Sequence, residues 1–432
     1  MSILHQGQKT PVSRRTVLKG AAALSGVAVA SSFFPAPAIS ATTEINVLSL
    51  GEGMFGQPFV DLSPAFTKAT GIKVNNITMG YNEAIQKQVA AFAGGSSSYD
   101  VVQVDSIYLK GYAKAGHLLP LDDLIPADDL KDFFSDIPQA FKEMYGDDGK
   151  TYGMATIGNC QRLIYNKAHL DAVGLGVPQT WDDLLAASQK VVDPKANRFG
   201  FIAGTERLAK AFGVWLPIFW ANGGVIFDDK MKPIFADQNG VDSLAFLLEL
   251  VKTMPPGGAA YTEGDEVKAM ATGLGTLDPV AWIPDAHVTA DAATKSQLVS
   301  AVPPKGTVTS APVMGGLGLT VSKYCADPKP AAQFVAWFNS RDVQSNMIVQ
   351  HGGQPCRNSA WEANATAKPW FPAVAASLKL AKVRPQIPEW SQVDSEVGVQ
   401  LSRAFAGDIS PKEALEAAQK SVDQIMRDAG YY

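Results

Sequence analysis

The first strong structural signal is the sequence EINVLSL at residues 44–50, an apolar run that predicts a buried strand. Phe59, Leu62 and Phe66 follow at helical spacing and predict a helix that ends near Gly71. The chain is therefore expected to begin its folded part with a strand followed by a helix.

The same alternation continues downstream. The sequence IKV at 72–74 begins a second strand, residues 84–92 predict a second helix, and YDVVQVD at 99–105 predicts a third strand that ends in a carboxylate. Alternating strands and helices indicate a parallel-type α/β sheet. Such sheets bind ligands beyond the carboxyl ends of their strands, which makes Glu52 and Asp105 candidate site residues.

The rest of the chain is richer in helix. One helix is expected to begin at Trp181, with Thr180 as its N-cap and two acidic residues in its first turn. Other helices are predicted at residues 209–221, 238–253, 330–338, 343–350 and 411–429.

Composition and charge restrict the function. The chain has 432 residues, of which 46% are hydrophobic and 18% charged, as expected for two or three globular domains. The formal charge is −5; residues 1–41 hold four basic residues and no acidic one, so the remainder carries −9. Because a body this acidic is a poor match for polyphosphates, we expect no nucleic-acid partner.

Residues 1–41 have the layout of an export signal. A charged start with Arg14 and Arg15 precedes a Gly/Ala-rich apolar stretch and a small-residue exit. The paired arginines resemble the twin-arginine (Tat) signal of bacteria, with an ordinary secretory signal as the alternative. The first cysteine is Cys160, so none can carry a lipid at the cleavage site. We expect a freely diffusing periplasmic protein.

The reactive side chains form no catalytic or metal-binding motif. Cys160, Cys325 and Cys356 are an odd set without Cys-x-x-Cys spacing; a Cys325–Cys356 disulfide is an alternative to free thiols. The five histidines are scattered, and nucleophile-elbow, P-loop and dinucleotide-binding motifs are missing from the sequence. We expect no cofactor and no enzyme activity.

Several segments, taken in order, resemble one family. Together they are similar to the maltose-binding-like sugar-binding proteins of ABC importers, the extracellular solute-binding family 1, over nearly the whole mature chain. The segments are DGKTYGM at 148–154, LIYNK at 163–167, PQTWDDL at 178–184, ANGG at 221–224, GGLGL at 315–319, GGQPCRNS at 352–359, IPEW at 387–390 and PKEAL at 411–415.

The resemblance implies an α/β fold of two lobes, the clamshell of periplasmic binding proteins. After a signal peptide at 1–41, lobe one would comprise residues 42–155 plus 313–355, and lobe two residues 160–305 plus 360–432. Three interlobe crossings would form the hinge near 154–160, 303–313 and 353–361. A monomer of this kind closes over a carbohydrate or sugar alcohol and delivers it to two permease subunits and their cytoplasmic ATPase.

Aromatic side chains are the first candidates for contact with such a ligand, because sugar rings stack on them. Relatives carry a sugar-stacking tryptophan in a segment that corresponds to Trp282, which follows Asp278, also a candidate. Trp215 and Trp220 lie on the helix that reaches the cleft in relatives. Trp390 lies in the IPEW segment.

The polar candidates are fewer. Asp105 matches the hydroxyl-binding carboxylate of the family, with a helix N-cap as the alternative. Arg357 lies in the family's Gly-Gly-x-Pro-x-Arg turn, where it either donates to a polyol or acidic sugar or forms a hinge salt bridge. Glu52 and Tyr81 are expected in loops and Asn159 at the first crossing, and Gly316 would let the backbone approach the ligand.

Other functions are not excluded by the sequence. The same fold could bind a polyamine, iron or a peptide instead of a sugar. A periplasmic glycoside hydrolase would need two carboxylates, for which Glu52, Asp105 and Asp278 could be proposed without any supporting motif. A cofactor-bearing oxidoreductase is disfavoured because Cys and His clusters are missing from the sequence.

Overall fold

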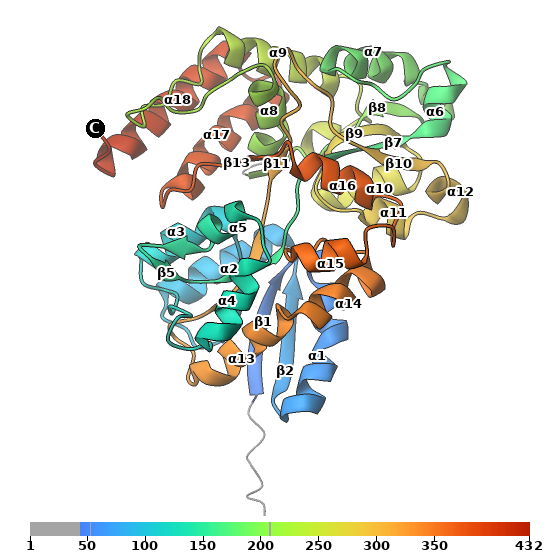
Figure 1. Ribbon diagram of the computed structural model, residues 1–432. Coiled ribbons are helices and arrows are strands. Elements are labelled where there is room, and N and C mark those ends of the chain that lie inside the picture. The colour runs from blue at the N-terminus through green and yellow to red at the C-terminus, as the bar shows by residue number, and fades with distance from the viewer. Residues whose placement is uncertain (1–43, 52, 207–208) are drawn as a thin grey trace, which may run out of the picture. The chain divides into compact units, whose positions relative to one another are not determined.

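The computed structural model describes residues 44–51, 53–206 and 209–432 (Figure 1). The expected export signal at 1–41 and the candidate Glu52 lie outside the described residues. The described chain forms two lobes, each built around one main sheet.

The sheet of the first lobe has the order β2-β1-β3-β12-β6, and the sheet of the second lobe has the order β10-β7-β9-β8. The strands are β1 (Glu44–Leu50), β2 (Lys73–Met79), β3 (Val101–Asp105), β6 (Met154–Ile157), β7 (Arg162–Asn166), β8 (Phe199–Phe201), β9 (Gly275–Ala281), β10 (Leu298–Ala301) and β12 (Leu317–Val321). Two short strand pairs accompany them, β4 (Gly146–Asp147) with β5 (Lys150–Thr151) and β11 (Val313–Met314) with β13 (Lys382–Val383).

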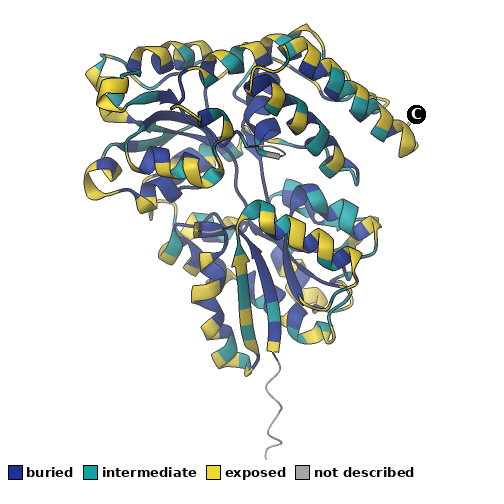
Figure 2. Cartoon of the chain, turned by 180° about the vertical axis from the view of Figure 1, so that it is seen from behind, coloured by how far each residue is buried: buried dark blue, intermediate teal, exposed yellow. Residues whose placement is uncertain are grey.

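The predicted beginning of the fold is confirmed. β1 pairs in parallel with both β2 and β3. Between β1 and β2, helix α1 (Gln57–Thr70) buries Phe59 and Phe66 and ends at Gly71, whose φ of 77° suits glycine as a helix C-cap. Figure 2 shows the inner strands in the buried colour, whereas the edge strand β2 is partly exposed along its length.

The expected parallel sheet is right for β2, β1 and β3, whereas most of the other main strands pair antiparallel. β12 runs antiparallel to both β3 and β6. In the second lobe β7 runs antiparallel to β9 and β10, whereas β8 is parallel to β9. Strand–helix alternation fixes the direction of consecutive strands, and it does not constrain a strand that enters the sheet from a distant part of the chain.

The predicted helices are confirmed, with ends that shift by a few residues. Thr180 caps α7 (Trp181–Val191) in a reciprocal capping box with Asp183. The other predicted helices are α8 (Ala209–Ala221), α9 (Gln238–Val251), α13 (Pro328–Phe338), α14 (Arg341–His351) and α18 (Pro411–Asp428).

None of the described helices combines the length and apolar character that a membrane span requires. Further helices complete the two lobes. They are α2 (Tyr81–Ala93), α3 (Ser106–Lys114), α4 (Ala127–Ser135), α5 (Gln139–Met144), α6 (Lys167–Ala172), α10 (Glu263–Ala271), α11 (Asp285–Thr289), α12 (Ala292–Lys295), α15 (Asn358–Ala363), α16 (Phe371–Leu378) and α17 (Trp390–Phe405), with 3-10 turns η1 (Gly53–Phe55), η2 (Pro194–Ala196) and η3 (Gly258–Ala260).

The core of the second lobe is built on an aromatic stack. The ring of Trp215 lies 5.9 Å from Phe212 and 4.5 Å from Phe219, and Trp390 stacks on Phe212 at 5.6 Å. This stack joins α8 to α17, which also packs on α18. All three cysteines are free thiols, so the alternative Cys325–Cys356 disulfide is wrong.

Candidate functional site

A cavity lies where the carboxyl ends of the first lobe's strands meet the second lobe. Phe55 follows β1, Tyr81 follows β2 and Asp105 ends β3, and all three side chains line the cavity. Parallel strands present their carboxyl ends at one edge of a sheet, which explains why residues far apart in the sequence meet here. Asn159, just after β6, completes this wall.

The opposite wall comes from the second lobe. Lys210 lies in the first turn of α8, Glu263 begins α10, and Trp282 directly follows β9. Arg384, which follows β13, places its guanidinium 5.8 Å from the centroid of the Trp282 ring, within range of a cation–π contact. The cavity is therefore assembled from segments of both lobes.

The charged side chains of the cavity form two ion pairs. Asp105 accepts hydrogen bonds from the Tyr81 hydroxyl at 2.8 Å and from Arg384 Nη2 at 3.5 Å. Lys210 Nζ lies 3.0 Å from Glu263 Oε1 and 5.7 Å from the centroid of the Tyr81 ring. Each charge thus has an opposite partner nearby, as buried charges require.

The ionisation states follow from burial and neighbours. Burial, followed by the Asp105 carboxylate, raises the pKa of Tyr81 well above its usual value, so the phenol stays protonated and its O–H donates a hydrogen bond to Asp105. Burial alone would lower the pKa of Lys210, but the carboxylates of Glu263 and Glu266 outweigh it and raise the net pKa. Lys210 is therefore a stable ammonium.

Apart from Glu263 Oε1, which lies in the ion pair with Lys210, two polar atoms in the cavity wall have no hydrogen-bond partner within the described part of the protein. They are Asn159 Oδ1, an acceptor, and Arg384 Nε, a donor, on side chains that are 5% and 6% exposed. An unpaired buried polar atom costs about 1–3 kcal/mol, so the cavity offers one acceptor and one donor to a ligand.

The backbone also approaches the cavity closely. A Cβ at Gly315 would lie 2.5 Å from Asn159 Oδ1 and 3.0 Å from the Trp282 ring, so no larger residue fits there.

Beside the cavity lies a wider compartment of about 500 Å³, which shares Phe55, Tyr81 and Glu263 with it. In the described ranges, no group of three or more His, Cys, Asp or Glu side chains is placed to hold a metal ion.

Four of the residues expected from the sequence line this cavity together: Tyr81, Asp105, Asn159 and Trp282. Asp105 also accepts the backbone N–H of Ile107 and so caps α3, which confirms the N-cap alternative for this residue, while its carboxylate also lines the cavity.

The other candidates lie elsewhere. Trp215 and Trp390 are fully buried in the aromatic stack of the second lobe, and Trp220 is 5% exposed in the same core. Apolar helical spacing does not distinguish a core tryptophan from a cleft tryptophan, which is why the sequence suggested them. Asp278 is buried beside Glu266 and accepts the N–H of Val280.

Gly316 does not line the cavity, although the neighbouring Gly315 does. A Cβ at Gly316 would face Met144 and Phe141 of the first lobe, and its carbonyl accepts the N–H of Ser106. The close backbone approach expected at Gly316 therefore occurs one residue earlier in the chain.

Sequence reasoning missed Phe55, Lys210, Glu263 and Arg384. The motif Thr262-x-x-Asp265, a capping box, could have located the start of α10 and thus Glu263. For Arg384, which lies in an irregular segment, we see no sequence signal.

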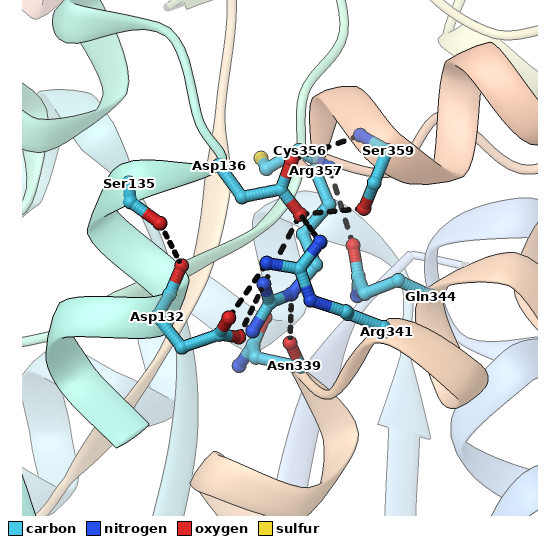
Figure 3. Close-up of polar contacts among 9 residues, drawn as sticks. All are labelled: Asp132, Ser135, Asp136, Asn339, Arg341, Gln344, Cys356, Arg357 and Ser359. Carbon is cyan, nitrogen blue, oxygen red and sulfur yellow. Dashed lines mark hydrogen bonds and ion pairs between the residues drawn. The ribbon is translucent and has the colours of Figure 1, made fainter. Parts of the chain in front are cut away.

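Arg357 does not line the cavity and belongs to a polar network in the first lobe (Figure 3). Its Nη1 lies 3.1 Å from Asp136 Oδ2, and its Nε donates to the carbonyl of Asn339 at 2.7 Å. Asp136 also accepts Arg341 Nη1 at 2.9 Å and the backbone N–H of Ser359 at 2.9 Å. Of the two roles left open for Arg357, the structure displays the salt bridge.

Two sheets that face a common cavity define a two-lobed binding protein. The chain belongs to the family of bacterial extracellular solute-binding proteins, whose model matches residues 55–345. It is 28% identical, over 97% of its own length and 99% of the relative's, to a probable amino-acid ABC transporter periplasmic-binding protein of Sinorhizobium fredii.

Solved ABC transporter solute-binding proteins share the fold. One from Agrobacterium radiobacter, in complex with ribitol, has a TM-score of 0.80 at 24% identity and covers 89% of this chain and 98% of its own. Another from Agrobacterium vitis, with bound D-mannitol, has a TM-score of 0.78 at 23% identity over 90% and 99% of the two chains.

We predict that Asp136→Asn lowers the free energy of unfolding at pH 7 by about 2 kcal/mol, because a charge-assisted hydrogen bond to the buried Arg357 is lost. Burial opposes ionisation of Asp136, but bonds from Ser359 and Arg357 together with the charge of Arg341 outweigh it, so its pKa is lowered. The stabilisation is thus complete above the unfolded pKa of about 3.9 and disappears as the pH falls through the folded pKa.

Urea unfolding at pH 7 and at about pH 3 measures this difference. Asp123→Asn, at an exposed position, is the control, and its free energy of unfolding should match that of the parent at both pH values. A deficit in Asp136→Asn that stays the same at low pH would contradict the ionic origin of the effect.

Proposed function

We propose that the cavity binds a neutral polyhydroxylated solute, a sugar or sugar alcohol. The observation that carries this proposal is the compensation of charge: Asp105 pairs with Arg384 and Lys210 pairs with Glu263. An anionic or cationic solute would have to break one of these pairs and leave a charge without its partner. A solute without charged groups leaves both pairs intact.

Hydroxyl groups suit the remaining hydrogen-bonding capacity. A hydroxyl both donates and accepts, so it can satisfy the free acceptor on Asn159 as well as the free donor on Arg384. The indole of Trp282 offers an apolar face for the carbon side of the same molecule. The ribitol and D-mannitol complexes of the two structural relatives support this class of solute.

An amino acid is the second candidate. The Sinorhizobium fredii relative is described as a probable amino-acid ABC transporter periplasmic-binding protein. Arg384 could face the carboxylate of a zwitterionic amino acid, and Asp105 its ammonium group. Such a ligand is neutral overall but separates the existing pair. We favour the polyol because it does not.

The setting of this function is also a proposal. We propose a periplasmic monomer that delivers its solute to two permease subunits with a cytoplasmic ATPase, and membership of the solute-binding family supports this setting. Export through the arginine pair is proposed from the sequence of residues 1–41. We also propose lobe boundaries at 42–155 plus 313–355 and 160–305 plus 360–432, with three crossings. The division of strands between the two sheets supports the boundaries. Closure over the solute would bring the two walls of the cavity together.

A thermal-shift screen tests the solute class. Pentitols, hexitols, mono- and disaccharides, amino acids and polyamines are each added in large excess over the protein. At about 100 times the dissociation constant, a ligand stabilises the folded state by about 2.7 kcal/mol, so a polyol or sugar should raise the melting temperature. Stabilisation by amino acids alone would favour the second candidate, and recovery of a cleaved sugar would identify a hydrolase.

We predict that Trp282→Ala weakens binding of the solute found in this screen by about five- to 150-fold, because the stack contributes roughly 1–3 kcal/mol. Its unliganded melting temperature should change little, since this side chain borders the cavity. Calorimetry measures the affinity. Trp337→Ala is the matched control: that ring packs 5.2 Å from Phe66, so it should lower stability and preserve affinity. Unchanged affinity in Trp282→Ala would remove it from the site.

The paired arginines test the export route. If the Tat system recognises this pair, a double substitution Arg14→Lys with Arg15→Lys should leave uncleaved precursor in the cytoplasm. Fractionation with antibody detection measures this, and Lys9→Arg with Lys19→Arg serves as a charge-preserving control. Normal export of the first variant would assign the signal to the general secretory route.

A further inference from the structure

Gln354 connects the wall of the cavity to the segments that run between the two lobes. It lies between α14 and α15, and its side chain is completely buried. Its carbonyl accepts the N–H of Gly158 at 2.8 Å, and the next residue, Pro355, bridges to Ile157 at the end of β6. Two segments that leave the first lobe are thus fastened together at this point.

The side-chain amide of Gln354 reaches into the second lobe. Its Nε2 donates to the backbone carbonyl of Trp282 at 3.0 Å, and its Oε1 accepts from Arg162 Nη1 at 3.2 Å. Arg162 lies on β7 and is also fully buried. One amide therefore joins the hinge-side segments to the residue that forms the aromatic face of the cavity.

Hydrogen-bond chemistry permits only one orientation of this amide. A guanidinium can only donate and a carbonyl can only accept, so Oε1 must face Arg162 and Nε2 must face Trp282. Nε and Nη2 of Arg162 have no hydrogen-bond partner in the described part of the chain, so the bond from its Nη1 to Gln354 is costly to lose. The carbonyl of Trp282 is therefore held by a group that cannot rotate freely.

We propose that Gln354 is a positioning residue for solute binding: by holding the carbonyl of Trp282, it orients the indole against Arg384 and couples that orientation to the hinge-side segments. The part played by the indole rests on the proposed function. The positioning of Trp282 itself does not, and it can be measured in the protein alone.

Two substitutions separate the bonds of the amide. Gln354→Glu has the same shape and keeps the acceptor for Arg162, but it cannot donate to Trp282. Gln354→Met has a similar size and makes neither bond. The matched control is Gln344→Glu: Gln344 is equally buried, accepts the N–H of Cys356 and donates to the carbonyl of Phe338, so it serves the same segment without contacting Trp282.

The first measurement is fluorine NMR of the full mature chain labelled with 5-fluorotryptophan, without added solute. The Trp282 resonance is assigned by its loss in Trp282→Phe, and that of the core residue Trp181 is the internal reference. We expect the Trp282 resonance to shift or broaden in both Gln354 variants and to stay in place in Gln344→Glu. An unchanged resonance in the Gln354 variants, or an equal change in the control, would overturn the proposal.

The second measurement is the calorimetric affinity for D-mannitol. Loss of one oriented hydrogen bond should weaken binding by about ten-fold in Gln354→Glu, with the affinity of Gln344→Glu unchanged. Parent-like affinity in both Gln354 variants would reduce Gln354 to a structural residue and overturn its role in binding. If the parent itself does not bind D-mannitol, the proposal for the solute fails. The NMR result still decides whether Gln354 positions Trp282.

Discussion

The cavity is organised around the compensation of the buried carboxylate of Asp105. A buried charge must be compensated, and this one is compensated from three directions. It caps the backbone of α3 at Ile107, accepts the hydroxyl of Tyr81 within its own lobe, and pairs with Arg384 across the cavity. The same group therefore ends a strand, begins a helix and brings the two walls together.

The second pair extends this logic to the other side of the cavity. Lys210 lies against Glu263 within the second lobe and over the ring of Tyr81 in the first. Nearby, the amide of Asn82 donates to Glu206 at 3.0 Å, again from one lobe to the other. In the proposed closure, contacts of this kind are remade, so affinity for a solute and the balance between lobe positions share the same side chains.

The sequence predicted the parts of this protein that depend on local chemistry. The strand at 44–50, the caps at Gly71 and Thr180 and the position of Asp105 at a strand end all follow from short-range patterns. The cavity as a whole could not be predicted, because Arg384 enters it from an irregular segment distant in sequence. The prediction that aromatic residues at helical spacing line the cavity was wrong, because a hydrophobic core and a binding cleft both favour aromatic side chains.

The net charge of the chain is a poor guide to the solute for a related reason. The folded part carries a formal −9, which would suggest a cationic ligand. The cavity, however, balances its two carboxylates with two cations, and interactions there are screened less than those at the surface. Excess acidic residues act on solubility and on encounters at long range. In the proposed site, the ion pairs of Asp105 with Arg384 and of Lys210 with Glu263 leave only hydrogen-bonding capacity for a solute.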